Sequence, residues 1–421
     1  MKNKNLLLFL LAFLIFSLPL SAQNTGEDLT IKIAVAGPGS EVYLWWGHIA
    51  LVIEDAKTGR SRFYDYGIFS YDNENFFYNF AFGRLLFSCG VSSSNYNMAH
   101  YVFSNRSITL YTLDIPPENR LKVLDVAETN VLPENCNYYY HHFNDNCSTR
   151  IRDIIDIATD GQFFEKYGDE PGRFTLRQHV RRHTWFNPFF DWLLNFLMGQ
   201  NIDTPISVWQ EMFLPSEVGN RINEFFYTDA DGNERQLVCG EEIVYKAEGR
   251  HQILDKPRLQ WPRELIIGLV IMLILGFFYY LQTKNVAGQI LLGLSISILG
   301  LFFGLSSLLL WFISLFTNHD YAHHNMNLIF VTPLILAAIP LGIRYAFARS
   351  FQTREKYDLL LRILWLLVLL GIIVSMLLKL LPCFWQNNLV DELLLLPIAA
   401  ILALEPTGLK ELFGRIFWRW S

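Results

Sequence analysis

Two stretches decide the fold of the N-terminal half of the sequence, HIALVIE at residues 48–54 and RFYDYG at residues 62–67. Both are rich in the β-branched and aromatic residues that favour strands, and the Thr58-Gly59 pair between them is typical of a tight turn. We therefore predict a β-hairpin here, preceded by a short apolar strand over residues 31–36.

The register of this hairpin decides which side chains share a face of the sheet. If Glu54 faces Ser61, then Ala50 faces Asp65. Because side chains alternate between the two faces of a strand, His48 and Asp65 then lie on the same face. A shift of one residue would separate them, so this placement depends on the register.

A helix is predicted directly after NDNC at residues 144–147. Apolar residues recur there at helical spacing, at Ile151, Ile154, Ile155 and Ala158. Asp145 and Asn146 are residue types that cap helix N-termini, so Cys147 is expected in the first turn. Free backbone N–H groups and the positive end of the helix dipole stabilise a thiolate at this position and can hold an oxyanion.

These two elements supply the groups of a cysteine-based active site. We expect Cys147 to be the nucleophile, His48 the base that takes its proton, and Asp65 the carboxylate that orients the imidazole. Asn144 and Asn146 are expected to bind the oxyanion or to orient the thiol. The spacing leaves other assignments open: His100, His141, His142, His179 or His183 as base, and Asp145 or Tyr64 in place of Asp65. A buried cysteine and a strand histidine that merely pack are a further alternative.

The N-terminus, residues 1–22, has the pattern of a secretory signal peptide. Two lysines precede an apolar run over residues 6–20, and small residues follow it where a signal peptidase cuts. An uncleaved anchor helix is the alternative. In either case we expect residues 23–256 to form an exported, periplasmic catalytic domain, with a linker at 257–263 and a transmembrane domain at 264–421.

Cysteine usage and net charge narrow the classes of partner. The sequence has no CxxC pair and no histidine pair at zinc spacing, so neither a metal nor a cofactor is expected. Four of the five cysteines lie in the exported half, where either two disulfides form, or one thiol is catalytic and the others form at most one disulfide. With 40 acidic and 34 basic residues and a net charge of −6, no nucleic-acid partner is expected.

The composition changes abruptly after Pro262, where five long apolar stretches follow. They lie at residues 265–281, 290–316, 328–346, 359–381 and 393–404. At about 1.5 Å of rise per residue each is long enough to cross a bilayer, except the last, which is borderline. We therefore predict a bundle of five transmembrane helices.

Positive charges between these stretches predict their orientation, because short loops rich in lysine and arginine stay on the cytoplasmic side. The loop after the third stretch carries Arg344, Arg349, Arg354, Lys356 and Arg362. Residues 317–327 and 382–392 contain no lysine or arginine and are expected to face the exported domain. This pattern predicts a protein of the bacterial cytoplasmic (inner) membrane, with the catalytic domain on the periplasmic face and the C-terminus in the cytoplasm.

One outward loop is unusually polar, HDYAHHNMN at residues 319–327. Polar residues at a membrane surface are often functional, so we expect this loop to contact the substrate. The candidates are His319, His323, His324, Asn325 and Asn327, together with Trp46 of the exported domain. Helix capping and ordinary interfacial polarity are the alternative, and a metal site on His319 and His323 lacks further ligands.

A further segment fits a lipid substrate. Arg177, Arg181 and Arg182 precede an aromatic-rich segment at residues 185–198, which resembles an interfacial helix with basic residues directed at anionic phosphates. A helix packed in the core of the domain is the alternative. Either would border a channel for an acyl chain.

Several motifs, in order along the chain, resemble the Lnb-type lipoprotein N-acyltransferase family. They are WWGH at 45–48, FYDYG at 63–67, NRS at 105–107, NDNCSTRIRD at 144–153, DTP at 203–205, FLP at 213–215 and NMN at 325–327. The resemblance covers nearly the whole chain. It implies an α+β exported domain with a circularly permuted papain-like core of the NlpC/P60 and lecithin:retinol acyltransferase kind, followed by an α-helical bundle of five spans. It carries the roles of base and nucleophile to His48 and Cys147, whereas permuted papain-like proteins vary at the third position, here Asp65.

The activity that this resemblance implies is acyl transfer, which suits a thiolate nucleophile. A membrane-bound cysteine acyltransferase of this family moves an acyl chain from the diacylglyceryl group to the α-amino group of the N-terminal Cys of a bacterial lipoprotein, through a thioester. The expected partners are diacylglyceryl-modified lipoproteins and membrane phospholipid, and the oligomeric state is open. The alternatives are a membrane-anchored NlpC/P60-like cysteine peptidase or amidase acting on cell-wall peptides, and a non-enzymatic lipid- or lipoprotein-binding module with Cys147 in a disulfide.

Overall fold

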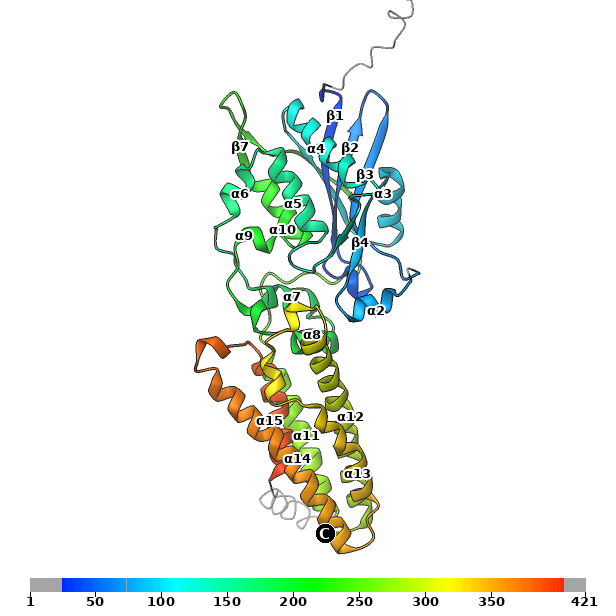
Figure 1. The fold of residues 1–421 in the computed structure, drawn as a ribbon, viewed down its shortest axis with the longest axis vertical. Helices are drawn as coiled ribbons and strands as arrows, with labels where there is room; N and C mark the ends of the chain where they lie inside the picture. The colour runs from blue at the N-terminus through cyan, green and yellow to red at the C-terminus, as the bar shows by residue number, and fades with distance from the viewer. Residues whose placement is uncertain (1–24, 73, 405–421) are drawn as a thin grey trace, which may run out of the picture.

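The structure, a computed structural model, describes residues 25–72 and 74–404. An α+β part formed by the N-terminal half stands at one end of an elongated molecule, and a bundle of long helices extends from it (Figure 1). The predicted signal peptide lies outside the described residues, and so does the basic tail after residue 404.

Within the described residues, seven strands form one antiparallel sheet in the order β6-β4-β3-β2-β1-β5-β9. The strands are β1 (Leu29–Ala36), β2 (His48–Asp55), β3 (Arg60–Ile68), β4 (Leu86–Ser93), β5 (Ile108–Leu113), β6 (Asn137–Tyr139) and β9 (Val238–Tyr245). A separate hairpin pairs β7 (Phe226–Thr228) with β8 (Glu234–Gln236). The predicted β2–β3 hairpin therefore lies at the centre of a larger sheet.

The predicted register of this central hairpin is confirmed. Glu54 pairs with Ser61, and Ala50 pairs with Asp65. Ala50 is fully buried in a cluster on one face of the sheet, together with Tyr101 of α3 (Ser94–Phe103). Strand alternation places His48 and Asp65 on that same face.

Helices cover the other face of the sheet and enclose the main core of this part. These helices are α4 (Pro117–Asn130), α5 (Cys147–Ala158) and α10 (Pro215–Glu224). Ile49, Leu51 and Ile53 of β2 point into this core, where they meet Ile151 and Ile155 of the predicted helix α5. Residues 49–53 of β2 are all buried, but they alternate between this core and the cluster beside α3, so α5 and α3 lie on opposite faces of the sheet.

The remaining elements are short. They are α2 (Phe76–Ala81), α6 (Gln162–Tyr167), α7 (Leu176–Thr184), α8 (Pro188–Leu197) and α9 (Val208–Glu211), with the 3-10 helices η1 (Val42–Leu44) and η2 (Gln200–Asp203). Of these, α6 and α9 pack beside α5 in the helical layer. Helix α2 lies at the end of the sheet that is nearer to the bundle (Figure 1).

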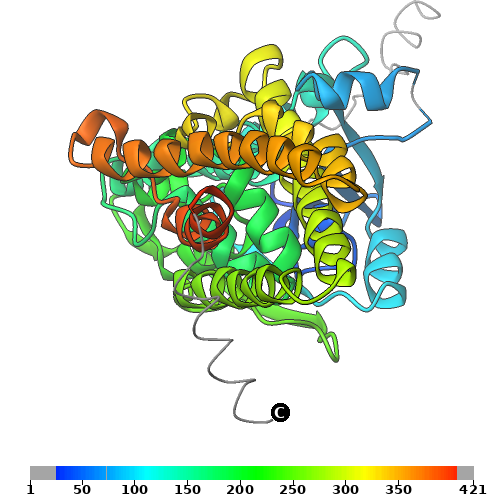
Figure 2. The ribbon, with the colours of Figure 1, turned by 90° about the horizontal axis from the view of Figure 1, so that it is seen from below.

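The C-terminal part consists of α11 (Trp261–Leu281), α12 (Val286–Phe316), α13 (Ala338–Ala346), α14 (Phe351–Leu378) and α15 (Leu389–Ala403). Short 3-10 turns connect them: η3 (Asp320–Ala322), η4 (Met326–Ile329), η5 (Pro333–Ala337) and η6 (Pro382–Phe384). Helix α15 packs between α11 and α14 (Figure 2). Helices α12 and α13 approach closely, because a Cβ on Gly293 would lie 2.5 Å from the carbonyl oxygen of Gly342.

Three of the described helices, α11, α12 and α14, are long and apolar enough to cross a membrane by length and composition. The third and fifth predicted stretches form shorter helical segments, over Pro333–Ala346 and in α15, which contains Pro397. Pro397 has no N–H to donate to the hydrogen bonds of α15. The third segment begins only at Pro333, because the turn η4 precedes it. The count of five spans stays a prediction.

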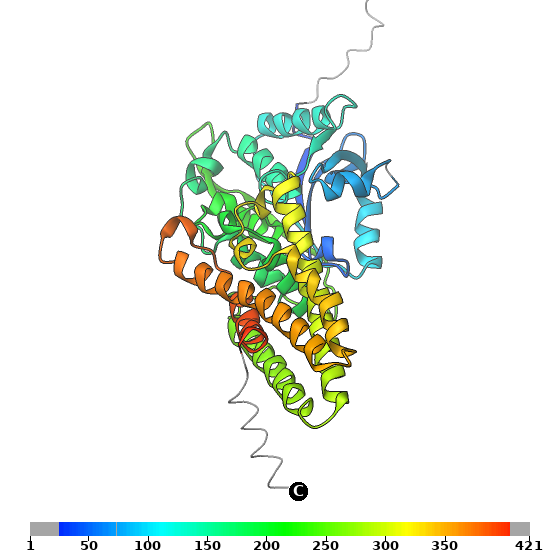
Figure 3. The same cartoon turned by 60° about the horizontal axis from the view of Figure 1, so that its bottom comes forward.

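Buried polar side chains connect the two parts, and we call Arg177, Asp203, Asn325, Asn327 and Asp391 the polar joint. Arg177 is fully buried and donates to Asp203 Oδ1 at 2.8 Å, while Asp203 Oδ2 accepts the backbone N–H of Asn387 at 3.1 Å. Asn325 and Asn327 both donate to the carbonyl oxygen of Phe196, at 2.9 and 3.0 Å, and Asn327 also donates to Asp391 at 3.0 Å. The joint thus ties α7 and α8 to the bundle. Figure 3 shows the bundle with its lower end turned toward the viewer.

The prediction that Arg177, Arg181 and Arg182 face lipid phosphates is wrong. All three are buried. Arg181 donates to Asn195 Oδ1 and to the carbonyl oxygen of Asn387, both at 3.1 Å, and Arg182 pairs with Glu217 at 3.1 Å. Burial of a guanidinium is tolerated when its N–H groups are paired, and these partners lie far away in the sequence.

Candidate active site

Cys147 is the first residue of α5, as the sequence predicts. The Asn146 side chain accepts the backbone N–H groups of Ser148 and Thr149 at 2.8 and 3.0 Å, and the Thr149 hydroxyl accepts the Asn146 N–H at 2.8 Å. This capping box fixes the start of the helix. The Cys147 side chain, 9% exposed, therefore lies where the positive end of the helix dipole favours a thiolate.

His48 and Asp65 come together on the α3 face of the sheet. His48 Nε2 lies 2.6 Å from Asp65 Oδ1, and both side chains are partly exposed, at 19% and 26%. The turn before His48 requires Gly47, whose φ is +82° and whose Cβ would lie 2.7 Å from the carbonyl oxygen of Ala36. The hairpin register and this turn together position the imidazole.

Electrostatics couple the histidine to the thiol. Burial alone raises the pKa of the Cys147 thiol, but the charge and a hydrogen bond of His48, with a further bond from the Ile49 N–H, lower it to below its usual value. Burial lowers the pKa of His48, whereas Tyr101, Asp65 and Cys147 raise it by more, to well above 6.5. Both directions favour a thiolate–imidazolium pair.

Two side chains that the sequence reasoning assigned no role also lie near this site. Tyr101 of α3 is 5% exposed and interacts electrostatically with His48, Asp65 and Cys147. The Arg106 guanidinium lies 5.0 Å from the centroid of the Tyr101 ring and donates to the carbonyl oxygen of Gly37 at 3.0 Å. Its Nη2 is buried and has no hydrogen-bond partner among the described residues. For Arg106, the only signal in the sequence was its place in the NRS motif.

The rival candidates for base have other partners or lie elsewhere. His179 pairs with Glu211 at 2.9 Å, and the carbonyl oxygen of His179 lies 2.8 Å from His183 Nδ1. His141 pairs with Asp320 at 2.8 Å, while burial first, and then the charges of His319 and His141, lower the pKa of His142 to about 4. The remaining rival, His100, lies in the last turn of α3.

The rivals for the third position are also engaged elsewhere. Asp145 forms a two-pronged ion pair with Arg150, at 2.6 and 2.8 Å. The Tyr64 hydroxyl donates to Glu128, on the face of the sheet opposite Asp65. Asp65 therefore has the geometry that the orienting role requires.

Asn144 and Asn146 occupy different environments. Both ends of the Asn146 amide are used, because its oxygen caps α5 and its Nδ2 donates to the carbonyl oxygens of His142 and Phe213 at 2.7 and 3.1 Å. Asn144 is exposed, and its backbone N–H donates to His141 Nδ1 at 3.0 Å. Asn146 thus has the contacts of an orienting residue.

The polar loop docks on the N-terminal part close to Cys147. His319 Nε2 donates to the carbonyl oxygen of Phe80 at 2.9 Å, and Tyr321 donates to His319 Nδ1 at 2.8 Å. The Tyr321 ring also lies edge-on to His142 and Phe143, with centroid distances of 5.4 and 6.0 Å. The loop therefore braces the segment that leads into α5.

The substrate-contact prediction for this loop needs a correction at three residues. His319 is 7% exposed, and both of its ring nitrogens are bonded within the protein. Asn325 is 3% exposed and Asn327 is fully buried, and both belong to the polar joint, so neither side chain is open to a substrate. His323 Nε2 bonds the carbonyl oxygen of Thr317 at 3.0 Å, whereas His324 is exposed. Trp46 is half-buried against the apolar cluster that holds Phe143.

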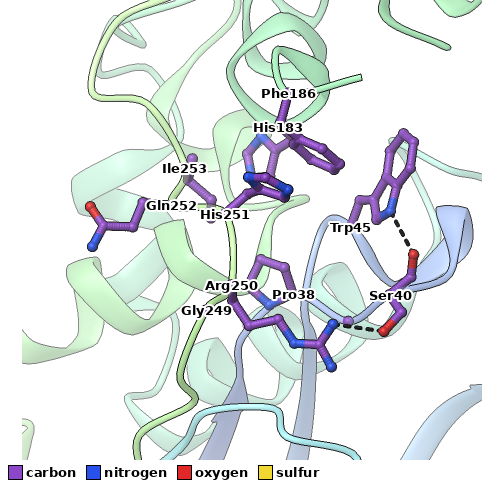
Figure 4. Close-up of a pocket in the computed structure, with 11 residues that line it drawn as sticks. Pro38, Ser40, Trp45, His183, Phe186, Gly249, Arg250, His251, Gln252 and Ile253 are labelled. Carbon is purple, nitrogen blue, oxygen red and sulfur yellow. Dashed lines mark hydrogen bonds between the residues drawn. The ribbon is translucent and has the colours of Figure 1, made fainter. Parts of the chain in front are cut away.

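A pocket of about 210 Å³ lies beside Trp45, between the loop after β1, α7 and the strap at residues 249–253 (Figure 4). Within it, Trp45 Nε1 donates to the carbonyl oxygen of Ser40 at 3.1 Å, and Arg250 donates to Ser40 Oγ at 2.7 Å. Its lining does not include Cys147, His48 or Asp65. The pocket is therefore separate from the thiol site.

All five cysteines lie within the described ranges, and each of them is free. The arrangement with two disulfides is therefore absent, whereas the alternative, with at most one disulfide, is compatible with these free thiols. No group of three or more histidine, cysteine, aspartate or glutamate side chains in residues 25–72 and 74–404 is placed to hold a metal ion. The thiol at position 147 is thus available for chemistry.

Comparisons with known proteins support the resemblance seen in the motifs. Residues 19–182 match the family model described as the Lnb N-terminal periplasmic domain. No curated protein and no solved structure matches the chain. The matched residues include His48, Asp65 and Cys147. Residues 19–182 of this chain are therefore similar to the N-terminal periplasmic domain of the Lnb family.

Proposed function

We propose that this protein is a lipoprotein N-acyltransferase of the cytoplasmic membrane that works through a thioester on Cys147. The observation that carries the proposal is the grouping of Cys147, His48 and Asp65 at the start of a helix. Two further findings support the proposal: the matched family model relates the chain to lipoproteins, and three of its described helices are long and apolar enough to cross a membrane. On this proposal the catalytic domain faces the periplasm and the C-terminus lies in the cytoplasm.

The first step forms the acyl-enzyme. The Cys147 thiolate attacks an ester carbonyl carbon of the diacylglyceryl group, so that a C–S bond forms and the C–O bond to glycerol breaks. The departing glycerol oxygen takes the proton that the His48 imidazolium holds. Asp65 keeps the imidazole in the orientation in which one ring nitrogen faces the sulfur.

The second step transfers the acyl chain to nitrogen. The α-amino group of the lipoprotein's N-terminal Cys attacks the thioester carbonyl, so that a C–N bond forms and the C–S bond breaks. Neutral His48 takes the proton that the amine loses, and the thiolate–imidazolium pair is restored. Because the ester and the amine belong to lipids or proteins anchored in one bilayer, the reaction takes place at its outer surface.

The test is made in cells that lack any other N-acylating enzyme. Cys147→Ala is expected to lower N-acylation by about 10⁴-fold or more, to background, with the protein still in the membrane. The measurement is mass spectrometry of lipoprotein N-terminal peptides. Cys239→Ala is the matched control, because Cys239 is a free, exposed cysteine on β9 and should be replaceable without loss.

Two outcomes would contradict the proposal. Full N-acylation in the Cys147→Ala variant would reject the mechanism. Release of soluble peptide from purified cell-wall material by the intact protein, with no change at lipoprotein N-termini, would favour a peptidase or amidase instead.

A further inference from the structure

A group of aromatic side chains on and around α2 is exposed to an unusual degree. We call Phe69, Tyr71, Phe76, Phe77, Phe80 and Phe87 the α2 aromatic cluster. Phe77 is 70% exposed, Tyr71 51% and Phe80 47%. None of the residues of α2 is buried. Exposed apolar patches of this kind mark surfaces that meet another apolar surface or ligand.

The cluster is continuous with the membrane-facing part of the protein. The segment after α2 is fixed to the end of α12, because the Asn318 N–H donates to the carbonyl oxygen of Phe82 at 3.0 Å. The Phe82 ring lies 5.4 Å from that of Phe312 in α12, edge to face. Phe316, the last residue of this candidate span, is 68% exposed. The exposed rings of α2 therefore lie beside the end of this candidate span.

The cluster is also continuous with the thiol site. Phe76 stacks on Phe69 with a centroid distance of 5.7 Å, and Phe69 stacks on Phe87 at 5.0 Å. The Phe87 ring lies 4.6 Å from that of Tyr140, which interacts electrostatically with Cys147. An unbroken series of ring contacts thus leads from the exposed helix to the neighbourhood of the nucleophile.

Gly67 borders these ring contacts at their inner end. It ends the FYDYG motif with φ of +86°, and a Cβ there would lie 3.4 Å from the Tyr140 ring. A residue with a side chain would be strained in this backbone conformation. Gly67 follows Asp65 by only two positions, so the same strand orients the histidine and borders the aromatic route.

We infer that the α2 aromatic cluster binds the acyl chain that is transferred, and leads it from the outer leaflet to Cys147. The inference rests on the proposed function, because it assigns a binding surface to the donor of that reaction. The ligand is a saturated alkyl chain of a membrane-anchored ester. Flat rings suit it, because they offer a large apolar surface and lose little conformational freedom when a flexible chain lies on them.

The experiment compares two ester donors on the full-length protein in lipid nanodiscs. One donor is a palmitoyl diacylglyceryl lipopeptide with a blocked N-terminus, and the other is a water-soluble butyryl ester. Blocking the amine stops the reaction at the acyl-enzyme, so the measured quantity is the rate at which the Cys147 peptide gains acyl mass. The variants are Phe77→Gln and Phe80→Gln, whose exposed positions make a folding defect improbable on physical grounds.

The expected result is a loss that depends on chain length. For the palmitoyl donor, each variant should raise the donor concentration for half-maximal acylation by about 5- to 20-fold, whereas the butyryl donor should react unchanged. Phe226→Gln is the matched control, because Phe226 is 52% exposed on β7 at the end of the molecule away from the bundle. It should leave both donors unaffected.

The outcomes separate the inference from the proposed function. If Cys147 gains neither acyl group in the unaltered protein, the proposed function fails, and the inference fails with it. If Cys147 is acylated but both donors respond equally to Phe77→Gln and Phe80→Gln, only the inference is overturned.

A second measurement does not depend on catalysis. The probe is a lipopeptide with a photoreactive group at the end of its palmitoyl chain. In the Cys147→Ala protein it should label peptides that contain residues of the α2 aromatic cluster. Labelling confined to α11, α12 and α14 would overturn the inference, even if the two donors differed in rate.

Discussion

The thiol site and the polar joint both bury polar side chains, but they use them in opposite ways. In the polar joint the central side chains are bonded within the protein: Arg177 donates to Asp203 and to three carbonyl oxygens, and Asn327 bonds both Phe196 and Asp391, although Asp391 Oδ1 has no partner among the described residues. At the thiol site His48 forms a hydrogen bond with Cys147 and lowers the pKa of its thiol, and the buried Nη2 of Arg106 has no partner among the described residues.

This difference separates a structural network from a reactive one. A buried polar group with all its bonds made is strongly held in place, since removing one partner leaves another unsatisfied. A site that stabilises charge developing on a substrate needs hydrogen-bonding groups that are not already paired within the protein. We therefore expect substitutions in the joint to change stability and substitutions at the thiol site to change rate.

The largest effect is expected for His48→Gln. Loss of the base should lower the rate of Cys147 acylation by about 10²- to 10⁴-fold, because the thiol proton no longer has an acceptor. Thermal unfolding should change little, since the His48 side chain is partly exposed. The measurement is the acyl-enzyme rate beside the melting temperature in detergent. A melting temperature that falls in step with the rate would place His48 with the structural network instead.

Arg177→Met should produce the reverse pattern. Removing a buried guanidinium leaves the Asp203 carboxylate uncompensated, which costs about 3–5 kcal/mol of folding free energy. The melting temperature should fall by roughly 6–20 °C, while the acylation rate per folded molecule stays within a factor of a few. Arg60→Met is the matched control, because Arg60 is an exposed arginine on β3 and should cost less than about 0.5 kcal/mol. An unchanged melting temperature for Arg177→Met would contradict the structural role of the joint.

The same contrast explains what the sequence could and could not predict. The β2–β3 register followed from alternation and a Thr58-Gly59 turn, and the start of α5 followed from Asn146, all within a few residues of chain. The burial of Arg177 could not be predicted in this way, because its partner Asp203 is distant in sequence and charge alone indicates a surface. Tyr101 and Arg106 were missed for a similar reason, since Tyr101 comes from α3 and Arg106 from the connection between α3 and β5.

The start of the third predicted span shows the same limit of prediction from sequence. Hydropathy places an apolar stretch from residue 328, but the helical segment starts at Pro333, because Asn327 is fixed in the polar joint and the residues after it turn in η4. The apolar pattern gives the composition of such a segment. It does not show that residues 326–329 form a turn, in which Asn327 bonds distant residues.

The pH dependence of Cys147 alkylation tests whether His48 lowers the pKa of the thiol. Because His48 lowers the pKa of Cys147, the thiolate persists at pH values below the usual range for cysteine, and iodoacetamide should react there. The rate should fall only as the pH drops through this lowered pKa. In His48→Gln the lowering is lost while burial still raises the pKa, so the midpoint should move to higher pH. An unshifted midpoint would show that the helix dipole, not His48, holds the thiolate.

The smallest effect is expected at Asn146, which combines both kinds of behaviour at one residue. Its side chain is fully bonded, like the joint, yet it holds the helix that presents Cys147. Asn146→Ala should cost about 1 kcal/mol through loss of the cap, and Asn146→Ser, which keeps a capping oxygen, should recover most of it. Melting temperatures measure the stability that the cap contributes, and the pH midpoint of Cys147 alkylation measures the effect on the thiol. If Asn146→Ser restores stability but leaves the thiol less reactive, the bonds of Nδ2 to His142 and Phe213 position the nucleophile; if it restores both, the cap alone is sufficient.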